Sequence, residues 1–248
     1  MNTLKKRILV VIPFYNEFNA LKKMKLKIRN NFDKYKFLMI NDNSDDNSEK
    51  LFKDKRFLTL HNKQRMGIGY SLKKGMKYAS DNNYEICVFM SGNGKMKISD
   101  IKKMVNPIIL ENYDYANGSR FLKYNKKSNT PNFRYLSIKI LSIFLSILYN
   151  KKITDFSCGF RAFKTKKFIK FTKLKNSNLF NTYGFEYYLY AKVCLSKIRA
   201  KEVPITMWYP DKKLKKKYSK IIPFIDWYKM LIPWFICYID GKKFFNNK

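Results

Sequence analysis

Short apolar runs alternate with amphipathic stretches in the N-terminal half of the chain, and this alternation limits the possible folds more than any other feature. Stretches 18–32 and 71–79 carry apolar residues at helical spacing, and a third helix is expected from Ser99. Regular alternation of strands and helices predicts an α/β fold with a mostly parallel sheet and helices on both faces. The apolar runs, too short for helices, are the predicted strands: 8–12, 37–40, 57–60 and 86–90.

The composition indicates a folded chain with one main domain. Hydrophobic residues make up 46% of the 248 residues, with only 9 Gly and 7 Pro, which excludes disordered and fibrous proteins. No linker-like stretch divides the sequence before residue 210. We therefore expect one domain over residues 1–210, followed by a basic and aromatic segment over residues 211–248.

A large excess of positive charge narrows the choice of binding partners. The chain carries 52 Lys and Arg against 18 Asp and Glu, a formal net charge of +34. Such a field attracts nucleic acids, anionic lipids or phosphorylated substrates. The Lys residues are spread from Lys5 to Lys248, and no recognisable nucleic-acid-binding motif occurs. No nucleic acid is therefore expected as a partner, and a basic nucleic-acid-binding protein is the weakest alternative.

The cysteines and the single histidine, His61, argue against a zinc site and against a disulfide framework. No Cys-x-x-Cys pair occurs, and His61 stands apart from every cysteine in the sequence. This pattern is typical of a reducing compartment such as the cytoplasm. The apolar run near the N-terminus is short and meets Pro13, so it is not expected to be a secretory signal. The cysteines lie at positions 87, 158, 194 and 237.

Polar residues follow the predicted strands at the edge where ligands bind to parallel sheets. The carboxylates of Glu17 and Asp42 can accept hydrogen bonds from a nucleobase or from ribose hydroxyls. Gly67 and Gly69 allow the backbone to approach a ligand, and Arg65 before them can reach a phosphate. Each of these residues is also common in ordinary caps and turns. Their occurrence together favours a nucleotide site.

A series of motifs in a fixed order resembles glycosyltransferase family 2, most of all dolichol-phosphate mannose synthases and other polyprenyl-phosphate glycosyltransferases. The resemblance spans about residues 8 to 210. It implies a GT-A type, Rossmann-like fold and an inverting transfer from a nucleotide-diphosphate sugar to a lipid-linked acceptor such as dolichyl or undecaprenyl phosphate. The motifs are VIPFYNE at 11–17, INDNSDD at 40–46, GIG at 67–69, NGSRF at 117–121, DFSCGFR at 155–161, GFE at 184–186 and EVPI at 202–205.

The resemblance also assigns roles to individual residues. The expected nucleotide-sugar-binding residues are Pro13, Tyr15, Glu17, Asp42, Arg65, Gly67, Gly69, Ser91 and Asn93. The expected catalytic residues are Lys95, Arg120, Asp155 and Arg161, and the expected acceptor-binding residues are Arg134, Ser157, Arg161 and Glu186.

One departure from the family concerns the metal. The family holds Mg²⁺ or Mn²⁺ with an acidic D-x-D triplet after the fourth strand, where this chain has Ser91-Gly92-Asn93. Because a hard dication prefers charged oxygen ligands, a divalent cation is a doubtful cofactor here. Either Lys95 supplies the positive charge, or Asn93, Asp42 or Asp100 still holds a metal with the donor phosphates. The third alternative is a non-catalytic relic that binds nucleotide sugars, and we favour a working transferase with weak or absent metal dependence.

The nature of the acceptor decides which residues the chemistry needs. A lipid phosphate is already ionised, so arginines that position it suffice. We expect Arg120 and Arg161, with support from Arg134, to bind this phosphate, and Asp155 to order Arg161 or its loop. A hydroxyl acceptor would need a general base, for which Asp155 is the first candidate and Glu186 the second.

Two apolar segments indicate where a lipid acceptor would come from. Residues 136–149 are almost wholly apolar but too short to span a bilayer, and they predict either a core helix or an interfacial helix. Residues 211–220 are rich in Lys and precede the aromatic stretch 221–239. This order suits C-terminal amphipathic helices on an anionic membrane surface. We expect a cytoplasmic protein attached peripherally to the cytoplasmic face of a membrane.

Overall fold

The computed structural model describes residues 7–122, 129–174, 177–209 and 227–246, and its core is a seven-stranded sheet. The strand order is β3-β2-β1-β4-β6-β5-β7. The predicted α/β fold is confirmed, and each of the four predicted strands occurs within two residues of its expected bounds. The strands are β1 (Ile8–Phe14), β2 (Lys36–Asn41), β3 (Leu58–His61), β4 (Ile86–Phe89), β5 (Tyr115–Ser119), β6 (Arg161–Lys164) and β7 (Ala200–Pro204).

Six of the seven strands run in one direction, and β6 runs against them. The order β3-β2-β1-β4 is parallel throughout, and β7 is parallel to β5. β6 lies antiparallel between β4 and β5, with Arg161 opposite Phe89. An antiparallel strand begins where its parallel neighbours end. Arg161 is therefore at the carboxyl edge of the sheet, where the loops after β1, β2 and β4 also lie.

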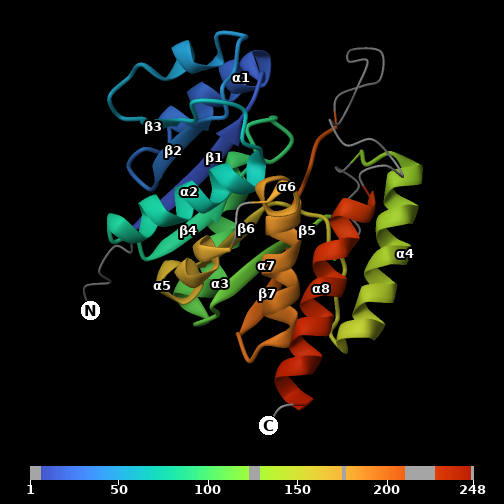
Figure 1. Cartoon of the computed structure of the whole chain (residues 1–248). Helices are drawn as coiled ribbons and strands as arrows, with labels where there is room; N and C mark the ends of the chain where they lie inside the picture. The colour runs from blue at the N-terminus through green and yellow to red at the C-terminus, as the bar shows by residue number, and fades with distance from the viewer. Residues whose placement is uncertain (1–6, 123–128, 175–176, 210–226, 247–248) are drawn as a thin grey trace.

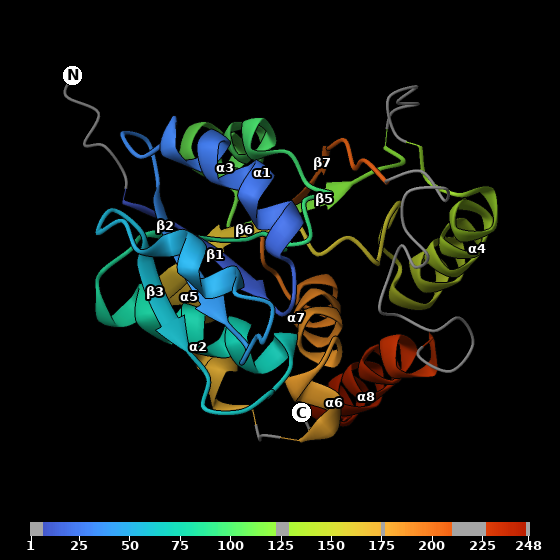
Figure 2. The ribbon, with the colours of Figure 1, turned by 90° about the horizontal axis from the view of Figure 1, so that it is seen from above.

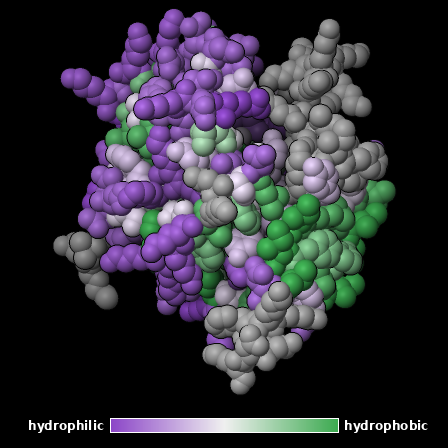
Figure 3. Space-filling view, in the orientation of Figure 1, coloured by the Kyte–Doolittle hydropathy of each residue, from purple (hydrophilic) through white to green (hydrophobic). Residues whose placement is uncertain are grey.

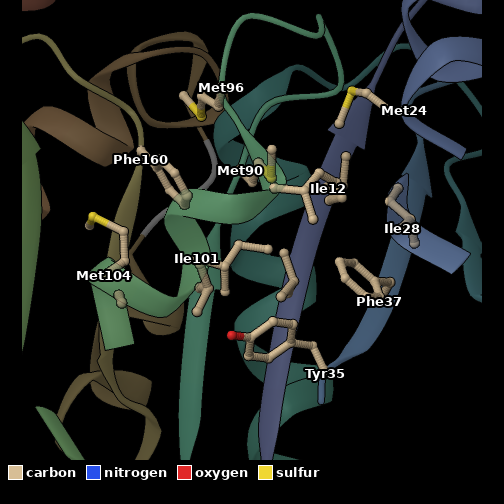
Figure 4. Close-up of a cluster of buried hydrophobic side chains, with 14 of the residues drawn as sticks. Ile12, Met24, Ile28, Tyr35, Phe37, Met90, Met96, Ile101, Met104 and Phe160 are labelled. Carbon is tan, nitrogen blue, oxygen red and sulfur yellow. The ribbon is translucent and has the colours of Figure 1, made fainter. Parts of the chain in front are cut away.

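Helices cover both faces of the sheet, as the alternation predicts (Figures 1 and 2). Residues of β1 alternate between the two faces: Val10 and Ile12 pack with α1 and α3, and Leu9 and Val11 with α2 and α7. Figure 4 shows part of the hydrophobic cluster that contains Ile12 and residues of α1 and α3. The helices are α1 (Phe18–Arg29), α2 (Ile68–Asp81), α3 (Ile101–Leu110), α4 (Asn132–Tyr149), α5 (Thr165–Phe168), α6 (Asn178–Asn181), α7 (Gly184–Leu195) and α8 (Trp227–Asn246), with 3₁₀ turns Ser48–Phe52, Ile98–Asp100 and Ile169–Lys173.

α1 is shorter than predicted, and one side of it is buried. The helix ends at Arg29 rather than at residue 32, and its buried residues are Leu21, Met24 and Ile28. Leu26, an apolar residue of the same stretch, is 67% exposed. Positions i, i+3 and i+7 share one side of a helix, and Leu26 lies on the other side.

α8 packs against the domain. Trp234 of α8 is fully buried in the same cluster as α7 residues, and its carbonyl oxygen accepts a hydrogen bond of 2.5 Å from the hydroxyl of Tyr149 on α4. The described part of the expected segment 211–248 thus shares the core of the preceding domain. The Lys-rich stretch 211–220 lies outside the described residues.

Candidate functional site

A cavity of about 580 Å³ lies at the carboxyl edge of the sheet and brings most of the predicted site residues together. Glu17, Asp42 and Asn93, which follow three different strands, share its lining. Gly69, Asp155 and Arg161 do not line it. The predicted residues in the lining are Pro13, Tyr15, Glu17, Asp42, Arg65, Gly67, Ser91, Asn93, Lys95, Arg120, Arg134, Ser157 and Glu186.

Asp42 shapes the loop before α2. One carboxylate oxygen accepts hydrogen bonds from the backbone N–H of Met66 (2.9 Å) and from Nδ2 of Asn62 (2.8 Å). The other accepts the backbone N–H of Gly67 at 2.8 Å. Gly67 has a φ of +97°, and a Cβ there would lie 2.4 Å from the carbonyl oxygen of Asn181. Asp42 therefore holds in place a turn that only glycine can form.

Gly69 has a packing role instead of the predicted ligand contact. It is buried in the first turn of α2, and a Cβ there would lie 2.4 Å from the carbonyl oxygens of Phe180 and Thr182. The missing side chain lets α2 approach the end of α6 and the residue after it. The geometry therefore favours a packing role over the expected donor contact at Gly69, because this close approach occurs outside the cavity lining.

The turn after β1 is held by side chains of the 44–48 segment. The backbone N–H groups of Asn16 and Glu17 donate to the hydroxyls of Ser44 (3.1 Å) and Ser48 (3.2 Å). Next to this turn, the guanidinium carbon of Arg65 lies 4.3 Å from the centre of the Tyr15 ring. These bonds set Tyr15, Glu17 and Arg65 on one wall of the cavity.

Arg120 follows β5, which lies on the far side of β1 and β4 from β2 in the sheet order, and it lines the cavity from that opposite side. It lies in a network of buried hydrogen bonds. Its Nε and Nη2 each donate to a carboxylate oxygen of Asp155 at 2.7 Å. Nη1 donates to the Tyr209 hydroxyl, and Nη2 also donates to the Ser157 hydroxyl, both at 2.6 Å. Burial would lower the pKa of Arg120, but the Asp155 carboxylate raises it well above its ordinary value. Arg120 is therefore a fixed cation.

The network changes the expected role of Asp155. Its side chain is completely buried and does not line the cavity. Asp155 was expected to order Arg161 or its own loop, or to act as a base for a hydroxyl acceptor. Its carboxylate pairs with Arg120 instead of Arg161, and it also accepts the backbone N–H of Ser157 at 3.3 Å, which orders its own loop. The geometry therefore favours a positioning role for Asp155.

Arg161, the first residue of β6, does not line the cavity. Its side chain is fully buried, with Nη1 donating to the Tyr115 hydroxyl at 2.8 Å and the guanidinium carbon 5.2 Å from the Tyr190 ring centre. Nε and Nη2 have no hydrogen-bond partner among the described residues. This geometry does not favour the expectation that Arg161 binds the acceptor phosphate, because the aromatic rings of β5 and α7 enclose its charge.

Glu186 faces the cavity from the first turn of α7. Burial raises the pKa of this carboxyl to about 7, and Arg161 partly offsets the rise. A Cβ on Gly159 would lie 2.8 Å from Oε1 of Glu186, so the glycine leaves room for the carboxyl. Glu186 is therefore a carboxyl that gains or loses its proton near neutral pH.

Tyr209 is the main residue that sequence reasoning missed. Its hydroxyl accepts the bond from Arg120, and its ring centre lies 5.3 Å from Nζ of Lys95 and 5.7 Å from the guanidinium carbon of Arg134. The backbone N–H of Tyr209 donates to Asn129 (2.7 Å), and Asn129 Nδ2 donates back to the Tyr209 carbonyl (2.5 Å). We call Lys95, Arg120, Arg134 and Tyr209 the Tyr209 cluster.

The side chains at the D-x-D position do not fit a divalent cation. The Ser91 hydroxyl accepts the backbone N–H of Asn93 at 3.5 Å, and Oδ1 of Asn93 accepts that of Lys95 at 3.2 Å. Asp100 is outside the lining and pairs with Lys103 at 2.7 Å. Within the described ranges, no group of three or more His, Cys, Asp or Glu could hold a metal. Neutral oxygens beside a lysine are a poor donor set for Mg²⁺ or Mn²⁺.

The sequence resembles enzymes that act on lipid phosphates. The sequence model of "Glycosyl transferase family 2" matches residues 9–172. The chain is 25% identical over 245 residues to the UDP-N-acetylglucosamine–dolichyl-phosphate N-acetylglucosaminyltransferase of Methanococcus voltae, covering 92% of this chain and 96% of that one. It is 24% identical over 207 residues to the undecaprenyl-phosphate mannosyltransferase of Micrococcus luteus, covering 81% and 83%.

Solved structures share the fold. Glucosyl-3-phosphoglycerate synthase of Mycobacterium tuberculosis, bound to Mn²⁺, UDP and glucosyl-3-phosphoglycerate, superposes with a TM-score of 0.67 at 14% identity, covering 95% of this chain and 80% of that one. Mannosyl-3-phosphoglycerate synthase of Rubrobacter xylanophilus gives a TM-score of 0.66 at 9% identity, covering 99% and 76%. The expected GT-A architecture is confirmed.

Proposed function

This chain belongs to glycosyl transferase family 2 and is a glycosyltransferase, and on that premise we propose that it transfers a sugar from a nucleotide-diphosphate sugar to a polyprenyl phosphate, with inversion at the anomeric carbon. The observation that carries the proposal is the single cavity whose two walls differ in chemistry. One wall offers an aromatic ring, carboxylates, a glycine turn and the cation of Arg65, and the other offers the cations of Arg120 and Arg134 beside Tyr209. Relatives named for dolichyl- and undecaprenyl-phosphate transfer match most of the chain.

The first wall suits the nucleotide of the donor. Tyr15 offers a ring face, and the Glu17 carboxylate and the Gly67 turn lie beside it in the lining. Carboxylates accept hydrogen bonds from base and ribose groups, and a glycine turn lets backbone N–H groups approach phosphates. Arg65, stacked over Tyr15, supplies a cation at the same wall. Asp42 contributes by fixing the turn.

The second wall suits the phosphate of the acceptor. The ion pair with Asp155 fixes the orientation of the Arg120 guanidinium. Arg134 lines the cavity together with Arg120. Nε of Arg134 is buried and has no hydrogen-bond partner among the described residues. Guanidinium groups bind phosphate oxygens well, and an ionised phosphate attacks without a general base. The anion held here would therefore be the nucleophile.

α4 connects this wall to a lipid surface. Its buried side consists of Ile138, Ser142, Leu145 and Tyr149, and an apolar stripe lies on its outer side. Figure 3 shows the apolar surface over α4 and the neighbouring α8, whose Phe235 ring lies 6.2 Å from that of Phe144. The exposed apolar residues of the stripe and its neighbours on α4 are Phe133, Leu136, Ile140, Ile143, Phe144 and Ile147.

We propose that this surface lies on the anionic cytoplasmic face of a membrane. Among the described helices, Asn132–Tyr149 alone is long and apolar enough by composition to cross a bilayer, but one side of it packs on the domain. Arg134 sits in its first turn and lines the cavity. A polyprenyl chain along α4 would bring its phosphate to Arg134. The net charge of +34 favours an anionic surface.

Some of the structural neighbours hold Mn²⁺ or Mg²⁺ with UDP. We propose that metal dependence is weak or absent here, because the donor set at Ser91 and Asn93 does not fit a dication. Loss of the acidic triplet also favours one other function, a non-catalytic protein that binds nucleotide sugars. The retained cations of the second wall favour a working enzyme.

Product formation on a lipid decides between these two functions. The full chain would be incubated with a panel of UDP- and GDP-linked sugars and with undecaprenyl or dolichyl phosphate in anionic vesicles. We expect a lipid-linked monosaccharide with at least one donor, and a rate at least about 10²-fold lower for Arg120→Met. If the protein binds a donor but forms no lipid product in any of these incubations, the non-catalytic alternative is established.

A further inference from the structure

The loop at the D-x-D position carries a cation where its family carries anions. Lys95 follows Asn93 by two residues and lines the same cavity. A dication held at Ser91 and Asn93 would face this ammonium group, and like charges repel strongly in a partly buried site. The residues of this loop therefore select an anion, such as the diphosphate of the donor, rather than a metal ion.

The backbone fixes Lys95 in this position. Its N–H donates to Oδ1 of Asn93 at 3.2 Å, and its carbonyl oxygen accepts the N–H of Trp208 at 3.0 Å. A β-bridge pairs the next residue, Met96, with Met207. The 91–96 loop is thus paired with residues 207 and 208, which directly precede Tyr209. A cation held in advance needs little reorganisation when charge develops on the leaving group.

The other members of the Tyr209 cluster extend the positive field across the cavity. Nη1 of Arg120 donates to the Tyr209 hydroxyl, and Arg134 lies on the same ring at 5.7 Å. Asp155 is paired with Arg120, so Lys95 and Arg134 are the two cations of the cluster beyond this pair. The cluster thus brings cationic groups to the cavity lining.

On the basis of the proposed function, we infer that the Tyr209 cluster replaces the divalent cation of the family: Lys95 binds the leaving diphosphate while Arg120 and Arg134 bind the attacking phosphate. In the transfer, the bond between the anomeric carbon and the diphosphate oxygen breaks, and its electron pair goes to the diphosphate. A new bond forms from an acceptor phosphate oxygen to the anomeric carbon. No proton moves, and the ammonium group of Lys95 stabilises the released charge.

Calorimetric titration of the full chain with UDP, GDP and inorganic pyrophosphate tests the inference separately from catalysis. We expect the same affinity, within about twofold, in EDTA and in Mn²⁺. Lys95→Met should weaken diphosphate binding about tenfold or more and leave nucleoside binding unchanged, and Lys95→Arg should recover part of the loss. Lys97→Met is the matched control, because Lys97 is exposed and outside the lining. Thermal unfolding of each variant checks that it folds.

A second variant asks whether the loop can be returned to metal use. Ser91→Asp with Asn93→Asp in the Lys95→Met background should bind UDP in a Mn²⁺-dependent way. Wild-type binding that is lost in EDTA and restored by Mn²⁺ would overturn the inference, as would unchanged diphosphate binding by Lys95→Met. Metal-free binding without lipid product would contradict the proposed function alone. Lipid product formed only with Mn²⁺ would contradict the inference alone.

Discussion

Arg120 and Asp155 form an ion pair in which Nε and Nη2 each lie 2.7 Å from a carboxylate oxygen and neither side chain is more than 2% exposed. The carboxylate also accepts the backbone N–H of Arg120 at 3.1 Å. The pair therefore fixes the direction of the guanidinium, which also donates hydrogen bonds to the hydroxyls of Ser157 and Tyr209. Each charge is tolerated in the interior only because the other is present.

Asp155→Asn should damage both stability and transfer. It leaves the Arg120 cation buried without its counter-charge, which we expect to lower the free energy of unfolding by about 3–5 kcal/mol. The transfer rate should fall about 10²-fold, because the guanidinium of Arg120 is no longer held in the orientation that binds the acceptor phosphate. Urea denaturation and initial rates measure the two effects. Asp81→Asn is the control: its ion pair with Lys77 is solvent-exposed, and a comparable loss of stability there would contradict this account.

Glu186 should make stability depend on pH. Its folded-state pKa of about 7 lies above its ordinary value of 4.5 because of burial. The folded chain therefore holds this proton to a higher pH than the unfolded chain, and stability falls as pH rises from about 4.5 to about 7, by about 1.4 kcal/mol per pKa unit at most. Above that range the contribution levels off.

The comparison with Glu186→Gln isolates this carboxyl from other titrating groups. The difference in free energy of unfolding between wild type and the variant should change between pH 5 and pH 8, with the wild type relatively less stable at pH 8. Urea denaturation at several pH values measures it. A difference that stays constant across this range would show that Glu186 titrates normally.

The first wall of the cavity, which is proposed to bind the donor and is called the donor wall below, could be predicted from sequence because it depends on one rule of topology. Glu17, Asp42 and Asn93 each follow a strand of a parallel sheet, and such strand ends meet at one edge. Their common cavity required no knowledge of side-chain packing. The rule does not cover Arg161, which reaches this edge because the antiparallel strand β6 starts where β4 ends.

The wall proposed for the acceptor could be predicted only in part, through Arg120, Arg134 and Ser157, because the rest of it depends on contacts between distant residues. Tyr209 bonds Arg120 across 89 positions of sequence, and no local pattern marks it. The burial of Arg161 follows from Tyr115 and Tyr190, which come from β5 and α7. The pairing of Asp155 with Arg120 rather than Arg161 is likewise a result of tertiary packing. Local motifs identify such residues without showing which of them reaches the ligand.

Gly67→Ala should destabilise the donor wall. The substitution combines a left-handed backbone with a Cβ 2.4 Å from the Asn181 carbonyl oxygen, so the turn must move away from Asp42. We expect a lower melting temperature and at least about tenfold weaker UDP binding. Gly94→Ala is the matched control, because its φ is also positive at +74° but its Cβ would lie 3.3 Å from the Ala20 Cβ. Equal effects of the two substitutions would show that backbone strain alone is responsible.

Charged residues on the outer side of α4 should detach the protein from membranes without unfolding it. Ile140 and Ile147 are 56% and 77% exposed, so aspartate at these positions disturbs no core contact. In contact with an anionic bilayer, however, each aspartate would lose apolar burial and meet negative head groups. We expect Ile140→Asp with Ile147→Asp to reduce co-sedimentation with anionic vesicles at least about tenfold and to slow transfer to a membrane-embedded acceptor.

Leu26→Asp provides the control on a different surface. Leu26 is 67% exposed on α1, which lies against the sheet away from α4, so its substitution should leave vesicle binding unchanged (Figure 2). UDP binding should be the same in all three proteins, because none of the altered residues lines the cavity. If the α4 variant co-sediments as wild type does, the apolar stripe does not contact lipid, and the acceptor phosphate must reach Arg134 by another route.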